Sequence, residues 1–583
     1  MSTPRGKAPL TETIPNGRKR DATAPKDLTK SAAQPPVPAG AAPKPGLLSL
    51  GLRGAAGTLR FLGQVATRHP LALMQTLPDM SLELMRIGLG KSEMAPDRGD
   101  KRFADPAWQQ NPLFKTTMQT YLTYSAGADA YVDNLGLKGM TAERLRFGLV
   151  LARDAMAPTN FWANPAAIKR CFDTAGGSVV KGMANMTGDL VHNHGMPSMV
   201  DRRPFKIGEN IAFSPGAVIF RNEVFELIQY TPQSEMVYDR PILMVPPQVN
   251  KYYALDLSPG RSLYEYLGQR GIQVYGISWR NPTGAQRDWN FDTYVQATID
   301  AIEVVREVSG SPDVNLMGGC LGGMTAALTQ AHLAARGEED RIHSSTMFVT
   351  LLDCQSQGRM FLFATPATLA LARLVTVPTG VIDGWQMGSM FAWLRPNDLV
   401  WNYWVNNYLL GQDPPAFDIL AWNADTTRLT CGFHHQLLDM VEENQLARPG
   451  AMTVLGTPID VSRITTDTYV VGGLTDHITP WQTCYRTTQM VSGHTQFVLC
   501  SSGHIQTVVA DPTHRGLGYF VNPEIPPSAD DWLKAAERHE GSWWEHWVRW
   551  LAERSGEQRA APQALGSTRF ALREPAPGTY IYS

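Results

Sequence analysis

The sequence has little of several features that would assign a protein to a broad class at once. Its 583 residues carry a net charge of only −2, so we expect no basic surface for nucleic acid. No run of 18 apolar residues is uninterrupted, and the most apolar stretch, residues 361–381, contains Pro366, Arg373 and Pro378. We therefore predict no transmembrane helix. The apolar fraction of 43% is nevertheless sufficient for a large buried core.

Cysteine is also scarce, and its spacing is not that of a disulfide framework. The six cysteines include no CxxC pair. A reducing compartment such as the cytoplasm is the simpler expectation, and it leaves Cys320 as a free thiol. His192 with His194, and the segment 431–435, resemble fragments of metal sites. Neither supplies a full ligand set at zinc spacing, so we interpret both as structural and predict no metal site.

The first 46 residues lack large apolar side chains almost entirely. They contain nine prolines, eight Lys or Arg and three acidic residues. This composition predicts a disordered basic leader, and it lacks the apolar core of a secretory signal. We favour a solvated tail without a specific role over contact with an anionic surface.

The remainder of the chain changes pattern near residue 205. Residues 47–204 are predicted to be mainly helical; the segment 142–158, for example, has apolar residues at helical spacing and stops at a proline. After residue 205, short apolar runs alternate with helical ones. The runs predicted as strands are 217–230 (a pair), 241–247, 272–279, 314–319, 346–352, 468–473 and 496–503. This alternation is typical of a parallel sheet with crossover helices.

The alternation lapses from about residue 354 to 463, where Trp, Asn, Pro and Leu are frequent. An insertion of this length between two late strands predicts a cap over the active edge of the sheet. We therefore divide the chain into the leader (1–46), a helical N-terminal domain (47–204), a catalytic domain that contains the cap (205–560) and a C-terminal tail (561–583).

One short motif lies where a predicted strand meets a predicted helix. Residues 318–322 read G-G-C-L-G, the pattern of a nucleophile elbow with Cys320 in place of the usual serine. The following helix N-terminus would stabilise both a thiolate and an oxyanion. The backbone N–H of Leu321 is predicted to be one oxyanion donor, and that of Val249, after the strand 241–247, the second. A small buried cysteine without a catalytic role is the common alternative.

Two later residues strengthen the catalytic interpretation. Asp476 follows the strand 468–473, and His504 follows the last predicted strand. The order nucleophile, acid, histidine is that of the α/β-hydrolase fold. Asp476 is also suited to capping a turn, and His477 beside it is the alternative base. Because the base of this fold comes from the loop after the last strand, we favour His504.

A thiol nucleophile suits a substrate that is already a thioester. Transfer of an acyl group from coenzyme A to Cys320 exchanges one thioester for another at little free-energy cost. An alcohol can then attack the acyl-enzyme, with His504 as general base and Asp476 holding its imidazole. Coenzyme A would be part of the substrate and a product, so no separate cofactor is expected.

Long, unusual segments across about residues 105–550 match one known family. They include WQQNPLFKTTMQTYL (108–122), VPPQVNKYYALDLSPGRSL (245–263), ISWRNPTGAQRDW (277–289), LRPNDLVWNYWVNNYLLG (394–411) and GGLTDHITPW (472–481). On these segments the chain resembles the poly(3-hydroxyalkanoate) synthases, the polyester polymerases of bacterial storage granules. It is most similar to class II, the single-subunit type associated with medium-chain 3-hydroxyacyl groups.

The resemblance implies an α/β-hydrolase fold with a cap, preceded by a helical domain. It assigns the family's catalytic roles to Cys320, Asp476 and His504. It also implies growth of a polyester from 3-hydroxyacyl-CoA, an active homodimer, and a location on cytoplasmic granules together with granule-associated proteins. Gly319 and Leu321 depart from the class II pattern, so we expect differences in pocket shape and substrate range to arise there.

Two other functional classes remain open. One is a thioesterase or polyester hydrolase on the same scaffold, which the large cap and the thiol disfavour because both suit exclusion of water. The other is a non-enzymatic granule protein that has kept the fold. In the predicted cap, Arg395 has two possible roles. It could bind a phosphate of coenzyme A, and a structural ion pair with a neighbouring acid is at least as well supported.

Overall fold

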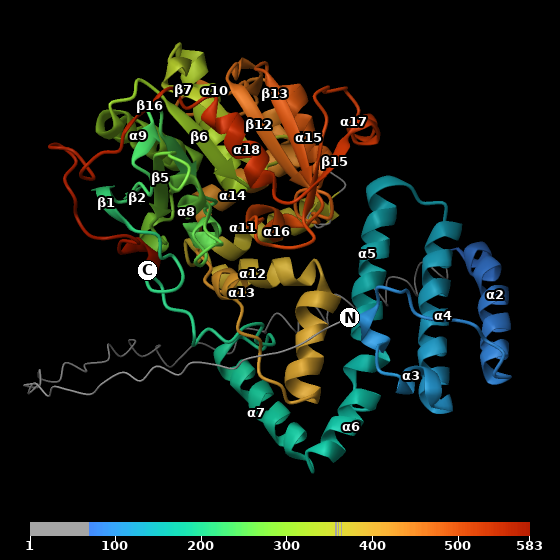
Figure 1. Ribbon diagram of the computed structural model, residues 1–583. Coiled ribbons are helices and arrows are strands. Elements are labelled where there is room, and N and C mark those ends of the chain that lie inside the picture. The colour runs from blue at the N-terminus through green and yellow to red at the C-terminus, as the bar shows by residue number, and fades with distance from the viewer. Residues whose placement is uncertain (1–68, 356–357, 359–360, 363) are drawn as a thin grey trace, which may run out of the picture. The chain divides into compact units, whose positions relative to one another are not determined.

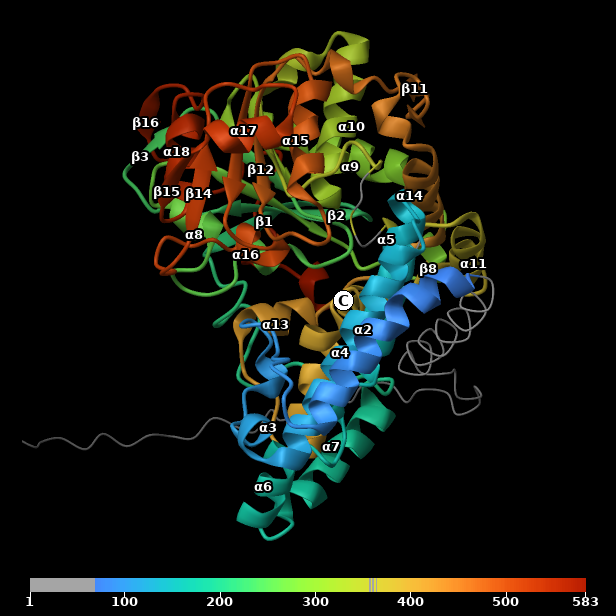
Figure 2. The ribbon, with the colours of Figure 1, turned by 90° about the vertical axis from the view of Figure 1, so that its right-hand side faces the viewer.

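The computed structural model describes residues 69–355, 358, 361–362 and 364–583; the predicted leader lies outside them. The N-terminal part of this region is helical (Figure 1). Its helices are α2 (Pro70–Gly88), α3 (Ala107–Gln110), α4 (Pro112–Asn134), α5 (Gly139–Ala155), α6 (Pro165–Asp173) and α7 (Gly177–His192). Helix α2 lies along α4 (Figure 2), where Asn134 donates a hydrogen bond of 3.0 Å to the Thr76 hydroxyl. None of the described helices is long and apolar enough to cross a membrane.

Helices α4 and α6 begin for a reason visible in the sequence. Each follows an Asn-Pro pair, Asn111-Pro112 and Asn164-Pro165, in which the asparagine side chain accepts backbone N–H groups of the first turn. Proline fits the first helical position because the N–H that it lacks would have no helical partner there.

The rest of the chain is built on a ten-stranded sheet in the order β1-β2-β5-β4-β6-β7-β12-β13-β14-β15. Its strands are β1 (Gly216–Arg221), β2 (Phe225–Tyr230), β4 (Ile242–Val245), β5 (Val274–Trp279), β6 (Val314–Gly319), β7 (Ile342–Phe348), β12 (Asp467–Gly473), β13 (Thr495–Cys500), β14 (Gly518–Val521) and β15 (Glu537–Glu540). The six central strands, β5-β4-β6-β7-β12-β13, run parallel to one another, and the two strands at each edge pair antiparallel. The predicted parallel α/β architecture is confirmed.

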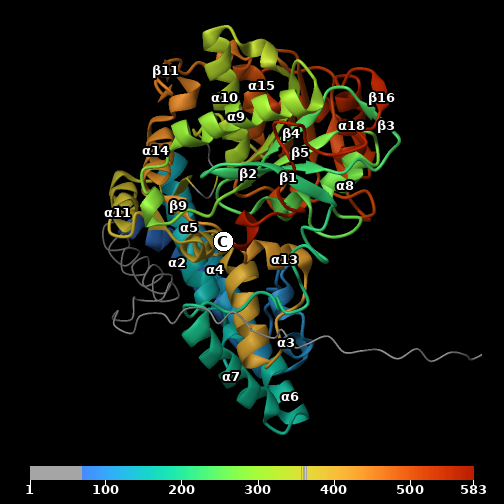
Figure 3. The same cartoon turned by 90° about the vertical axis from the view of Figure 1, so that its left-hand side faces the viewer.

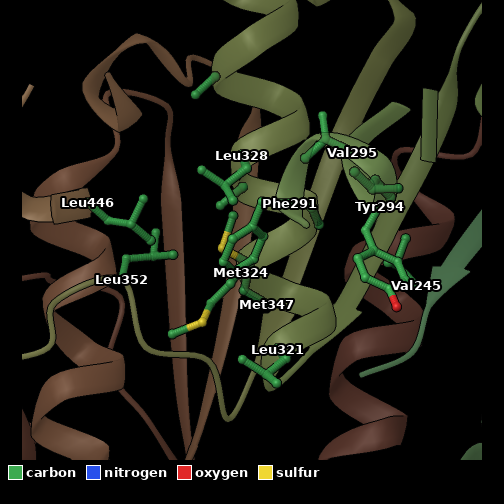
Figure 4. Close-up of a cluster of buried hydrophobic side chains, with 14 of the residues drawn as sticks. Val245, Phe291, Tyr294, Val295, Leu321, Met324, Leu328, Met347, Leu352 and Leu446 are labelled. Carbon is green, nitrogen blue, oxygen red and sulfur yellow. The ribbon is translucent and has the colours of Figure 1, made fainter. Parts of the chain in front are cut away.

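Helices cover both faces of this sheet. Figure 3 shows α9 (Phe291–Ser309) and α10 (Leu321–Arg336) on one side and α8 (Leu263–Gly268) and α18 (Trp543–Ala552) on the other. The first face holds the larger core, in which Leu321, Met324 and Leu328 of α10 contribute to a cluster of buried side chains (Figure 4). Helices α15 (Trp481–Met490), α16 (His504–Val508) and α17 (Ala529–Ala535) follow the later strands.

The prediction of a strand at residues 346–352 was wrong in its position. Strand β7 begins at Ile342 and ends at Phe348, after which Val349 has a positive φ of 45° and the chain leaves the sheet. The start was missed because Ser344 and Ser345 are polar yet buried; Ser344 donates to Asn315 and Ser345 accepts from Gln330. The apolar residues Val349, Leu351 and Leu352 that follow Phe348 are buried, but they do not extend the strand.

The segment between β7 and β12 has its own small elements. They are α11 (Pro366–Thr376), α12 (Gly384–Trp393), α13 (Asp418–Asn423), α14 (Cys431–Glu443), the strand pairs β8 (Val381–Ile382) with β9 (Leu429–Thr430) and β10 (Thr453–Val454) with β11 (Thr457–Pro458), and two π-helical stretches, Asn397–Trp401 and Trp404–Leu409. We refer to this segment as the cap.

The end of the chain packs against the first strands of the sheet. Strand β16 (Gln558–Ala560) pairs with β3 (Met236–Tyr238) in a separate two-stranded sheet, residue Pro575 forms a bridge with Ala217 of β1, and Ile581 is 1% exposed. Buried Glu226 on β2 accepts hydrogen bonds from the backbone N–H groups of Thr579 and Tyr580 and pairs with Arg221. Two backbone hydrogen bonds and one ion pair therefore offset the free-energy cost of burying this carboxylate.

Candidate active site

Cys320 occupies a strained turn between β6 and α10. Its φ and ψ are 51° and −122°, a conformation that costs a non-glycine residue about 1–3 kcal/mol. The turn is held by the Cys320 N–H, which donates to the Phe348 carbonyl at 3.0 Å. A side chain at Gly322 would meet the Val245 carbonyl at 2.2 Å, so only glycine allows α10 to approach the end of β4 this closely. The half-buried thiol therefore stands at the N-terminus of a 16-residue helix.

Asp476 and His504 meet at the carboxyl ends of β12 and β13. The His504 Nδ1 lies 2.6 Å from the Asp476 Oδ2, and both residues are 8% exposed. Asp476 also caps its own turn, because its Oδ1 accepts the N–H groups of Ile478 and Thr479 at 2.8 and 2.9 Å. Asp476 thus caps its turn and contacts His504 at the same time, through different carboxylate oxygens. His477 lies beside Asp476, but the nitrogen against the carboxylate is that of His504.

The electrostatics of this pair favour an imidazolium. Burial alone would lower the pKa of His504, but the charge and hydrogen bond of Asp476, together with the nearby Cys320 side chain, outweigh burial and raise it. Burial would likewise raise the pKa of Asp476, yet the neighbouring His504 holds it below its ordinary value. The structure therefore brings the three predicted residues into one site in which His504 can accept and hold a proton.

Thr479 is a member of this site that the sequence reasoning missed. Its hydroxyl donates to the Asp476 Oδ2 at 2.6 Å and lies 3.1 Å from the His504 Nδ1. With 3% of its surface exposed, Thr479 fixes the carboxylate oxygen that faces the histidine. The D-x-x-T spacing, which is that of a side-chain cap three residues apart, is the signal that could have identified it.

The two predicted oxyanion donors lie on either side of the β4–α10 contact. Leu321 is the first residue of α10, and Val249 lies in the loop after β4; the side chains of both are buried in the same core cluster. Among the backbone hydrogen bonds of residues 69–355, 358, 361–362 and 364–583, neither the Leu321 N–H nor the Val249 N–H has an acceptor. In this described part of the chain, neither N–H is therefore committed to a backbone acceptor, which is a condition that an oxyanion donor must meet.

Comparisons with known proteins decide the family. Residues 99–267 match the family described as the N-terminus of poly-beta-hydroxybutyrate polymerase, and residues 254–510 match the alpha/beta hydrolase fold. The chain is 45% identical over 517 residues to poly(3-hydroxyalkanoate) polymerase 1 of Ectopseudomonas oleovorans, covering 89% of this chain and 92% of that protein. The chain belongs to the poly(3-hydroxyalkanoate) polymerase family.

Other members of the polymerase family show the same extent of similarity. Poly(3-hydroxyalkanoate) polymerase 2 of Ectopseudomonas oleovorans is 44% identical over 91% of this chain and 95% of its own length. The polymerase subunit PhaC of Cupriavidus necator is 38% identical over 89% of this chain and 88% of its own length. The similarity therefore covers both the helical N-terminal region and the α/β-hydrolase region.

Three further predicted positions can be placed within this polymerase fold. At Gly319 a side chain would meet the Phe348 ring at 2.3 Å, so the ring occupies the space that a larger residue would need. The Leu321 side chain is 8% exposed and belongs to the core. Arg395 forms an ion pair with Asp398, three residues on. Over the described residues, no three His, Cys, Asp or Glu side chains are arranged to hold a metal ion.

Proposed function

We propose that this chain polymerises (R)-3-hydroxyacyl-CoA into poly(3-hydroxyalkanoate), with release of coenzyme A, through a thioester on Cys320. The observation that supports this most directly is the 2.6 Å contact between Asp476 and His504 beside the elbow cysteine, in a member of the polymerase family. The proposal requires no cofactor apart from the coenzyme A that the substrate carries.

In the acylation step, His504 takes the proton of Cys320, and the sulfur attacks the substrate's thioester carbonyl. The carbonyl oxygen becomes an oxyanion and accepts hydrogen bonds from the N–H groups of Leu321 and Val249. Collapse of this intermediate breaks the carbon–sulfur bond to coenzyme A, and His504 returns the proton to the departing thiolate. Asp476 stabilises the intervening imidazolium.

In the elongation step, the hydroxyl of a second 3-hydroxyacyl group replaces water as the nucleophile. His504 takes the hydroxyl proton, the oxygen attacks the Cys320 thioester, and the carbon–sulfur bond breaks as the ester bond forms. The proton then passes to the Cys320 sulfur. General-base assistance of this kind contributes about 10²–10⁴ to the rate.

A substrate panel tests the proposed reaction. Purified protein is incubated with (R)-3-hydroxyoctanoyl-CoA and, separately, with (R)-3-hydroxybutyryl-CoA. We expect free thiol and insoluble polyester to rise together, because each ester bond formed releases one coenzyme A. Free thiol accompanied only by free 3-hydroxy acid would instead establish a thioesterase or polyester hydrolase. Faster turnover of the octanoyl substrate is the outcome expected from the class II resemblance.

We also propose that the active form is a homodimer that resides on polyester granules in the cytoplasm, where it meets granule-associated proteins. This rests on the family resemblance. Light scattering of the purified, active protein before substrate is added should give a mass of about twice the 64.2 kDa of one chain. A monomeric mass at full activity would exclude the dimer, and fractionation of cells should recover the protein with the granules.

A further inference from the structure

The loop that carries Val249 is joined to one short segment of the cap. Residues 422–427 form the end of α13 and the segment after it, and they run beside residues 248–253, which follow β4. Thr427 makes two of the contacts: its hydroxyl donates to the Gln248 carbonyl (2.6 Å), and its backbone N–H donates to the Val249 carbonyl (3.4 Å). Thr426 forms a backbone bridge with Asn250. The Trp422 indole donates to the Lys251 carbonyl (2.7 Å), and the Tyr253 hydroxyl donates to Asp425 (2.8 Å). The cap thus contacts the loop at nearly every residue.

The contact from the Thr427 hydroxyl has a specific geometric consequence. The peptide between Gln248 and Val249 is planar and trans, so its C=O and N–H point in opposite directions. A hydrogen bond that holds the Gln248 carbonyl on the cap side therefore holds the Val249 N–H on the other side. Gln248 and Thr427 are each 3% exposed, so water does not replace this donor readily. Thr427 consequently sets the orientation of the peptide whose N–H is the candidate oxyanion donor.

The opposite side of the same loop is hydrogen-bonded to α10, the helix that follows Cys320. The Gln248 side-chain amide donates to the Thr325 hydroxyl at 2.9 Å, and Thr325 donates to the Leu321 carbonyl at 3.1 Å. The peptide is therefore held between the first turn of α10 and the cap. Without the Thr427 hydroxyl the Gln248 carbonyl would lose its hydrogen-bond donor on the cap side, and the plane of the Gln248–Val249 peptide would be held less firmly than by the two contacts together.

We propose that Thr427 is a positioning residue of the reaction: its hydroxyl holds the Gln248–Val249 peptide so that the Val249 N–H faces the oxyanion. This inference rests on the proposed Cys320 chemistry and adds to it a role for the cap. The cap then takes part in catalysis through a defined hydrogen bond and does not only cover the site.

The test is Thr427→Val, which keeps the side-chain shape and removes the hydroxyl. Loss of one oxyanion donor costs about 10²–10³ in kcat, and a donor that is present but poorly oriented should cost about 10–10². We expect kcat for coenzyme A release to fall by that factor with KM unchanged, and Thr427→Ser to restore most of it. Thr426→Val is the matched control, because the Thr426 hydroxyl makes no hydrogen bond among the described residues.

Alkylation of Cys320 by iodoacetamide separates positioning from general damage. The thiolate displaces iodide without forming an oxyanion, so Thr427→Val should alkylate at the wild-type rate, measured on the Cys320 peptide by mass spectrometry. A wild-type kcat in Thr427→Val, or slowed alkylation in both Thr427→Val and Thr427→Ser, would overturn the positioning role. Turnover that persists in Cys320→Ala would refute the proposed function itself, so the two failures are distinguishable.

Discussion

Replacement of Cys320 by alanine is expected to abolish both coenzyme A release and polymer formation. The sulfur is the only protein atom in the proposed scheme that becomes covalently bonded to the acyl group, and loss of a nucleophile within a catalytic triad costs about 10⁶ in kcat. Initial rates of thiol release from (R)-3-hydroxyacyl-CoA, together with intact-protein mass spectrometry for the acyl adduct, measure the effect. The wild type should gain the mass of an acyl group, and the variant should not.

The controls for this prediction come from the same chain. Cys171→Ser changes a half-buried thiol on α6 and should leave turnover unchanged. Cys320→Gly should be equally inactive but should unfold at a higher temperature than Cys320→Ala. The positive φ of 51° at this position costs a non-glycine residue about 1–3 kcal/mol, and glycine does not bear this cost. Retained turnover in Cys320→Ala would refute the assignment of Cys320 as the nucleophile and would favour a differently organised active site.

The candidate site was predictable from the sequence because of the sheet's topology. In a parallel sheet the carboxyl ends of successive strands share one edge, so residues that follow β6, β12 and β13 converge however far apart they lie in the chain. Cys320, Asp476 and His504 each follow one of these strands directly. The pattern of strands and glycines was sufficient to find them.

Other features depended on contacts that leave no periodic pattern. The edge strand β15 reads Glu-Arg-His-Glu and is largely exposed, so no apolar run indicates it. Thr427 lies 179 residues from Gln248, in a cap made of short elements, and its hydrogen bond exists only in the folded chain. Thr479 was closer to detection, since its role depends on a local turn; what the sequence lacked was evidence that the turn faces His504.

The second large effect is expected from Asp476→Asn, which removes a charge and preserves the turn. The Asp476 Oδ1 accepts two backbone N–H groups, so an asparagine must keep its oxygen there and place its NH₂ group toward His504. An NH₂ group against Nδ1 forces that nitrogen to accept, which moves the imidazole proton to Nε2, the nitrogen that should receive the proton of Cys320. The wrong tautomer in such a triad costs about 10⁴ in kcat.

The pH dependence of this variant follows from the same charges. In the wild type burial lowers the pKa of His504, and Asp476 together with Cys320 more than compensates; without the carboxylate the largest raising contribution is lost and the pKa falls. The imidazolium is then lost at a lower pH. The midpoint of the His504 imidazole titration, followed by NMR, should therefore fall in Asp476→Asn. Asp460→Asn, which changes another turn-capping aspartate, should alter neither kcat nor this midpoint. An unchanged midpoint in Asp476→Asn would mean that His504 holds its proton without Asp476, and the acid of the triad would have to be sought elsewhere.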